Sequence, residues 1–239
     1  LRSGILELAP EPERRRALLA LAGLDGRPPA RLAEWPRALA PLAGLLFGLG
    51  VVMWVAANWA DWSRPARFAL LQAAWLLALL GAWRLPRARA GLGLAALLLQ
   101  GGLLAFFGQT YQTGADPWQL FALWAALSLP LALALRSDLV WAPWTLLVAL
   151  GVQLWMHTYS GHRWGLESSS LGVQLGASAV LMAIWLALGP ELRRWSGSGP
   201  WAERAMALWL ALSVGGWGLV ALFERDWGLL YFWAGAVLA

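Results

Sequence analysis

Residues 90–107 read Ala-Gly-Leu-Gly-Leu-Ala-Ala-Leu-Leu-Leu-Gln-Gly-Gly-Leu-Leu-Ala-Phe-Phe, eighteen positions without a charged side chain. An α-helix needs about 20 mostly apolar residues to cross the hydrocarbon core of a bilayer, and this run comes close. The apolar residues do not alternate with polar ones, as they would in a strand of a membrane barrel. The run therefore predicts a membrane-spanning helix.

Working outward from this run, similar stretches fill most of the chain. Spans are predicted near residues 38–60, 66–84, 89–108, 117–135, 138–157, 169–189 and 203–223, and residues 228–239 begin an eighth. Apolar residues make up 60% of the chain and charged residues 13%, where soluble domains average about 45–50% and about 25%. We therefore expect an all-α, polytopic transmembrane helix bundle (residues 38–239) with seven spans plus the start of an eighth. A polar arm with a short amphipathic helix precedes it over residues 1–37.

The arginines predict how the bundle lies in the membrane. All 18 basic residues are arginine, and alternate connections place 14 of them on one side and four on the other. The richer side holds the arm and the loops after the second, fourth and sixth spans. Short cytoplasmic loops are enriched in Arg and Lys, so we predict a cytoplasmic amino terminus. The net charge of +5 then reflects topology, and no nucleic-acid partner is expected.

The most informative polar stretch lies on the predicted outer side. It reads Gly108-Gln109-Thr110-Tyr111-Gln112-Thr113-Gly114-Ala115-Asp116-Pro117-Trp118 and contains no arginine. Polar non-helical backbone at membrane depth must be buried in protein or line a wet cavity. This favours a turn whose Gln109 and Tyr111 are buried and hydrogen-bonded. The alternative is an ordinary loop whose side chains satisfy its own backbone. In both cases Asp116-Pro117 is expected to cap and begin the next helix.

A second polar group follows the first predicted span. If the outer loops meet, the two groups would form one outer-face ligand pocket, lined by Asn58, Asp61, Gln109, Tyr111, Gln112 and Asp116. The alternative is that Asn58 and Asp61 cap or pair locally at the end of their own helix.

Metal and catalytic motifs are weak. His157, His162 and Glu167 are residue types that bind zinc, but their spacing differs from the i, i+4 pair that places two histidines on one helical face. They are weak candidates only, and we expect no metal, no cofactor and no catalytic residue. Cysteine is absent, which excludes disulfides and thiolate metal sites. The interiors of the spans contain no carboxylate or arginine, which argues against an ion-coupled pump.

Two motifs resemble a known family. Asn58-Trp59 closes the first predicted span, and Gly108-Gln109-Thr110-Tyr111-Gln112-Thr113-Gly114-Ala115-Asp116 precedes a Trp118-Gln119-Leu120-Phe121 helix start. Both are similar to motifs of an uncharacterised bacterial family of multi-spanning membrane proteins, filed as a domain of unknown function. The resemblance covers about residues 35–135. It implies a bacterial inner (plasma) membrane location and no known activity.

Three function classes remain open. The first is a non-enzymatic binding or assembly component whose polar outer pocket engages another membrane protein or a small periplasmic ligand. The second is a carrier of a neutral or zwitterionic solute, which needs polar residues that continue to the cytoplasmic side. The third is a membrane-embedded hydrolase or transferase acting at the outer face. We expect a binding or assembly component. In all three classes the protein lies in the lipid bilayer.

Overall fold

The computed structural model describes residues 12–14, 31–58, 61–112, 114–160, 170–221 and 236. Within these residues the chain forms helices and turns and no strand, so the predicted all-α class is confirmed. Contacts divide the chain into two units, Leu1–Leu42 and Ala43–Ala239. Residues 12–14 and the beginning of α3 are the helical parts described in the first unit. The rest of the fold concerns the second unit.

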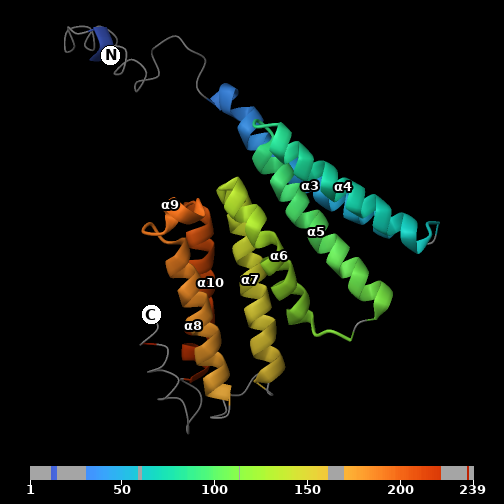
Figure 1. Ribbon diagram of the computed structural model, residues 1–239. Helices are drawn as coiled ribbons and strands as arrows, with labels where there is room; N and C mark the ends of the chain where they lie inside the picture. Colours follow the sequence, from blue (N-terminus) through green and yellow to red (C-terminus); the bar gives the residue numbers. More distant parts are fainter. Residues whose placement is uncertain are drawn as a thin grey trace. The chain divides into compact units, whose positions relative to one another are not determined.

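The helices follow one another with short connections (Figure 1). They are α3 (Arg31–Ala57), α4 (Arg64–Arg84), α5 (Arg89–Tyr111), α6 (Pro117–Leu135), α7 (Asp138–Tyr159), α8 (Leu171–Leu188), the short α9 (Arg193–Ser196) and α10 (Pro200–Ala221). Six of the described helices, α3 to α8, are long and apolar enough to cross a membrane. Helix α10 lies where the seventh span is predicted, and residues 228–239 lie outside the described residues except for Ala236. The count of seven spans and a partial eighth therefore stays a prediction.

Proline and capping residues set where the helices begin. Pro65 and Pro117 lie in the first turns of α4 and α6, where a missing N–H costs nothing. Asp116 is the N-cap of α6, and its backbone N–H donates to Oε1 of Gln119 at 3.2 Å. The prediction that Asp116-Pro117 starts a helix is confirmed. Helix α5 instead runs to Tyr111, three residues beyond the predicted end, so the turn that follows is shorter than expected.

Helix α5 is the most enclosed of the candidate spans, with 56% of its apolar window buried. Glycines let its neighbours approach closely. A side chain at Gly44 of α3 would overlap the carbonyl of Gly91, and one at Gly101 would overlap the ring of Trp124 in α6. The Trp124 indole N–H donates to the Leu97 carbonyl at 2.9 Å, which joins α6 to α5. Backbone and aromatic contacts of this kind are a common basis of helix packing in membranes.

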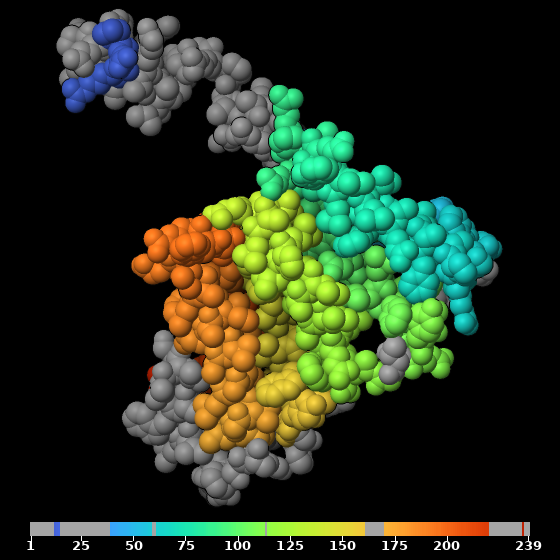
Figure 2. All heavy atoms as spheres, in the orientation of Figure 1, coloured from blue at the N-terminus to red at the C-terminus, as the bar shows by residue number. Residues whose placement is uncertain are grey.

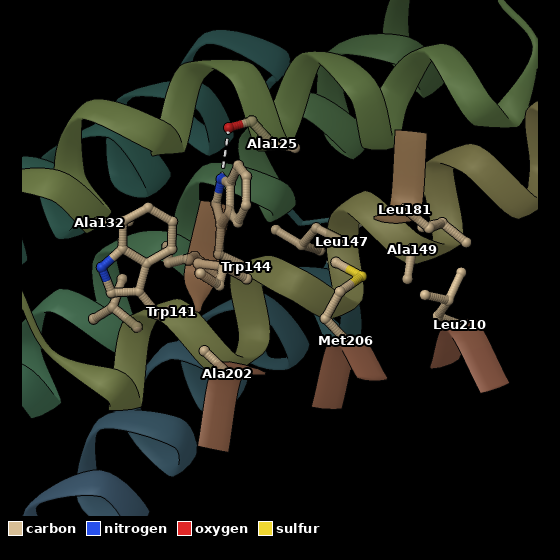
Figure 3. Packing of buried hydrophobic residues seen from close by; sticks show 13 residues of the cluster. Ala125, Ala132, Trp141, Trp144, Leu147, Ala149, Leu181, Ala202, Met206 and Leu210 are labelled. Carbon is tan, nitrogen blue, oxygen red and sulfur yellow. Dashed lines mark hydrogen bonds between the residues drawn. The ribbon is translucent and has the colours of Figure 1, made fainter. Parts of the chain in front are cut away.

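A second core lies among α6, α7, α8 and α10. Helices α6 and α8 flank α7 on the face shown in Figure 2. Figure 3 shows the cluster around Trp144 of α7, whose indole N–H donates to the Ala125 carbonyl of α6 at 2.9 Å. Leu181 of α8 and Met206 of α10 are fully buried against it. This packing fixes the connections at the two ends of these helices, where the polar residues gather.

Candidate functional site

The connection between α5 and α6 contains two residues with a left-handed backbone. Gln112 follows the last residue of α5 and adopts the left-handed conformation, with φ 43° and ψ 53°. Gly114 is left-handed as well, with φ 64°. The turn then ends at the Asp116 N-cap of α6. Two left-handed residues, one on each side of Thr113, therefore lie in the connection between the two spans.

The expected burial of Gln109 and Tyr111 is wrong. Tyr111 is 61% exposed and Gln109 is also exposed. The physical reason is that α5 continues through Tyr111, so the helix itself satisfies the backbone and the side chains project outward. The Tyr111 ring packs against Phe107 and Phe68, with ring centroids 4.7 and 6.2 Å apart. Within the described residues, neither polar side chain has a hydrogen-bond partner.

Asn58 and Asp61 show local contacts. The Asn58 amide donates to the Trp54 carbonyl of its own helix at 2.8 Å, and the exposed Asp61 donates its backbone N–H to the Asn58 carbonyl at 3.2 Å. Among the described residues, no hydrogen bond or ion pair joins either side chain to the turn after α5. Contact between α4 and the end of α5 runs through the rings of Phe68 and Tyr111. One pocket shared by all six predicted residues therefore stays a prediction.

The three weak metal candidates are only partly described. His157 is exposed near the end of α7, and its Nε2 lies 3.3 Å from the amide nitrogen of Gln153. His162 and Glu167 lie outside the described residues. No cluster of three or more His, Cys, Asp or Glu suited to a metal occurs in the part of the chain that the structure describes.

The most highly connected polar cluster lies at the other end of the second unit, where α6, α7, α9 and α10 meet. The Asp138 carboxylate, in the first turn of α7, accepts the backbone N–H groups of Gly199, Trp201 and Ala202 at 3.2, 2.7 and 2.9 Å. It thereby satisfies N–H groups at the start of α10 that lack a partner in their own helix. A side chain at Gly199 would overlap this carboxylate, so glycine is needed for the approach.

Arginine side chains complete this cluster, which we call the arginine-rich end. The Arg136 guanidinium donates to the carbonyls of Arg194 and Trp195 at 2.6 and 3.2 Å. Arg89 donates to the Ala134 carbonyl at 2.7 Å. Arg193 forms an ion pair with Glu203. These contacts tie together three connections that are far apart in the sequence, and they hold the chain in position rather than facing a ligand.

Sequence reasoning placed these arginines on one side of the bundle but missed the contacts of Asp138. Asp138 at a helix start is itself a readable signal, because a carboxylate favours the positive end of a helix dipole. Its three acceptor contacts are instead made to another helix, more than sixty positions away. No local pattern indicates such a long-range cap.

Long apolar helices that pack through glycine and tryptophan, with polar groups gathered where the helices end, define a multi-spanning helical membrane protein. A family model described as "Predicted membrane protein (DUF2157)" matches residues 11–141, more than half of the chain. The chain belongs to this family, as the resemblance in the sequence implied. No curated protein and no solved structure matches it.

Proposed function

We propose that the protein is a non-enzymatic binding or assembly component of the bacterial inner membrane. In this proposal the transmembrane domain follows a cytoplasmic arm over residues 1–37. The turn after α5 faces the periplasm and recognises another membrane protein or a small ligand. The orientation is supported by the arginine-rich end, because Arg89, Arg136 and Arg193 lie on connections that meet there and positive loops remain cytoplasmic.

The conformation of Gln112 is the observation that carries the binding role. A left-handed backbone at a non-glycine residue is uncommon and costs on the order of 1 kcal/mol. Gln112 is exposed, and its side chain has no partner among the described residues. The conformation ends α5, as a left-handed residue often does, but glycine is the usual residue at such a position. Glutamine bears the cost here, so its exposed side chain is a candidate for an external contact.

At Arg136, contacts within the protein account for a left-handed backbone. Arg136 is the other non-glycine residue with positive φ in the described part, at 51°. Its guanidinium reaches two backbone carbonyls near α9, so its conformation serves the fold. Gln112 has the same backbone shape without such contacts, and this contrast supports a role outside the chain.

The surface around Gln112 has the composition of a recognition site. The exposed residues Gln109, Tyr111, Gln112 and Asp116 offer two amides, a phenol and one carboxylate. Tyrosine is enriched in protein interfaces, and amides can both donate and accept hydrogen bonds. This surface suits a partner with polar groups at the membrane interface. It includes four of the six residues of the outer pocket predicted from the sequence.

Site-specific photo-crosslinking tests the proposal. A benzophenone amino acid is placed at Tyr111 of the full chain in living cells. The control carries the same probe at Phe47, an exposed aromatic residue within α3. We expect a discrete, heavier adduct from position 111 and none from position 47.

Gln112→Gly supplies a second control. Glycine adopts the left-handed conformation readily, so this variant should melt at or above the wild-type temperature. If Gln112 takes part in recognition, the adduct formed at position 111 should fall by about threefold or more, as the loss of one hydrogen bond implies. Equal adducts from positions 111 and 47, or an unchanged yield in Gln112→Gly, would refute the proposed role of the turn.

A further inference from the structure

An apolar groove of about 420 Å³ lies between α6, α7 and α8. It opens on the face of Figure 2, where α6 and α8 flank α7. Its volume falls in the range of about 300–1,000 Å³ that is usual for small-molecule sites. Its walls include Trp118 and Ala122 of α6, Trp155 of α7, and Gly176 and Val180 of α8.

The lining of the groove selects for hydrocarbon. None of its lining residues carries a charge, an amide or a hydroxyl, so the two indole N–H groups are its polar side-chain atoms. A side chain built at Gly176 would meet no atom within 4 Å. The groove is therefore open space that glycine leaves free, in a region where water finds almost no hydrogen-bond partner.

The groove runs through about two thirds of the hydrocarbon of one leaflet. On α6 it extends from Trp118 to Ala125, and on α7 from Trp155 to Val148. Seven residues of helix rise by about 10 Å, and half of a hydrocarbon core measures about 15 Å. Trp118 and Trp155 lie at its outer end, beside Tyr159, whose ring centroid is 6.4 Å from that of Trp118. Tryptophan and tyrosine mark the headgroup level of a bilayer, so the groove begins at that level and ends before the midplane.

One polar atom at this end lacks a partner. The indole nitrogen of Trp118 is shielded from solvent and makes no hydrogen bond in the described part of the chain. Buried indole N–H groups usually find an acceptor. An occupant of the groove would therefore be hydrocarbon along its length, with a hydrogen-bond acceptor at the headgroup level.

We propose that the groove holds one acyl chain of a phospholipid from the leaflet on the Trp118 side. The Trp118 ring turns its shielded N–H toward the headgroup level, where the ester carbonyl of that chain accepts a hydrogen bond from it. The chain runs past Gly176 toward Val180. A transmembrane helix of a partner fits less well, because it would need a groove through the whole thickness of the membrane. This lipid site is independent of the recognition surface proposed at Gln112.

Lipid photo-crosslinking tests the site. The full chain is reconstituted in phosphatidylcholine vesicles that contain a phosphatidylcholine with a diazirine in one acyl chain, and labelled residues are mapped by mass spectrometry. We expect labelling of Ala122 and Val180 at several times the level of Leu46, an exposed residue of α3. Gly176→Leu should abolish this excess. Gly216→Leu in α10, which is equally free of neighbours within 4 Å and lies outside the groove lining, should not.

Trp118→Phe isolates the hydrogen bond and guards against a folding defect in Gly176→Leu. With the ester-linked lipid probe, labelling of the groove should be about three- to tenfold lower in this variant than in the wild type. With the ether-linked analogue, which lacks the carbonyl, the two proteins should label equally. Uniform labelling of Ala122, Val180 and Leu46 would show ordinary surrounding lipid only. A groove that excludes lipid because a protein fills it would give labelling below that of Leu46, and either result would overturn the proposal.

Discussion

Asp138 concentrates more polar contacts than any single residue discussed above. Its carboxylate accepts three backbone N–H groups at the start of α10. Hydrogen bonds to a charged acceptor are stronger than neutral ones, and three donors lose their partner at once if the acceptor is removed. The residue thus stabilises the packing of α7 against α10.

We predict that Asp138→Ala lowers the free energy of unfolding by about 1–3 kcal/mol, the usual cost of leaving buried groups unpaired. Thermal unfolding in detergent, followed by circular dichroism, measures the change. Asp61→Ala is the matched control, because Asp61 is exposed and the removal of such a surface group shifts stability by under about 0.5 kcal/mol. Equal melting temperatures for the two variants would contradict the cap.

At the scale of single residues, the sequence predicts helix starts better than it predicts partners. Asp116-Pro117 indicates a cap because the signal is local, and the structure confirms it. The burial of Tyr111 was mispredicted because it depended on where α5 ends. A shift of three residues turned a supposed loop into the last helical turn and moved the side chain to the surface.

At the scale of helices, α3 can pack closely against α5 because glycines on α3 have no side chain. Gly44 and Gly48 lie one turn apart on α3 and face Gly91 and Ala95 of α5. Small residues at this spacing let two helix backbones approach closely in a membrane. The apolar runs predict both helices, but they do not reveal which faces meet, because every face of such a helix is apolar.

Two substitutions on the same helix should have opposite effects. Gly44→Ala places a methyl group against the Gly91 carbonyl, so we expect a destabilisation of about 1–3 kcal/mol, as for other overpacked sites. Gly50→Ala meets no atom within 4 Å and should be neutral or stabilising by about 0.5–1 kcal/mol, because alanine favours the helix. Urea or thermal unfolding in detergent measures the change in the free energy of unfolding for each variant. Destabilisation by Gly50→Ala, with none by Gly44→Ala, would contradict this packing of α3 against α5.

For the whole molecule, hydropathy predicts the class and the approximate bounds of most helices. The predicted spans near 66–84, 117–135 and 138–157 agree closely with α4, α6 and α7. The lateral order of helices has no counterpart in the sequence, because it depends on which small and aromatic residues meet. The groove between α6, α7 and α8 and the cluster around Asp138 both arise from that order.

Topology can be tested in cells because the chain contains no cysteine. A single cysteine at Gln112 should react with a membrane-impermeant maleimide in intact cells. A single cysteine at Glu191, exposed in the connection between α8 and α9, should react only after the membrane is permeabilised. The reason is the excess of arginine on the Glu191 side. The reverse labelling pattern would place the turn after α5 in the cytoplasm.

The cap on α10 also has a consequence for biogenesis. Asp138 leaves the ribosome more than sixty residues before the N–H groups that it will accept. At a synthesis rate of about 5–20 residues per second, this interval lasts roughly 3–12 s. During that time the N–H groups of α10 are absent, so water at the edge of the membrane solvates the carboxylate. The arrival of α10 exchanges that hydration for three backbone donors, so this corner of the protein is completed late, after translation has passed residue 202.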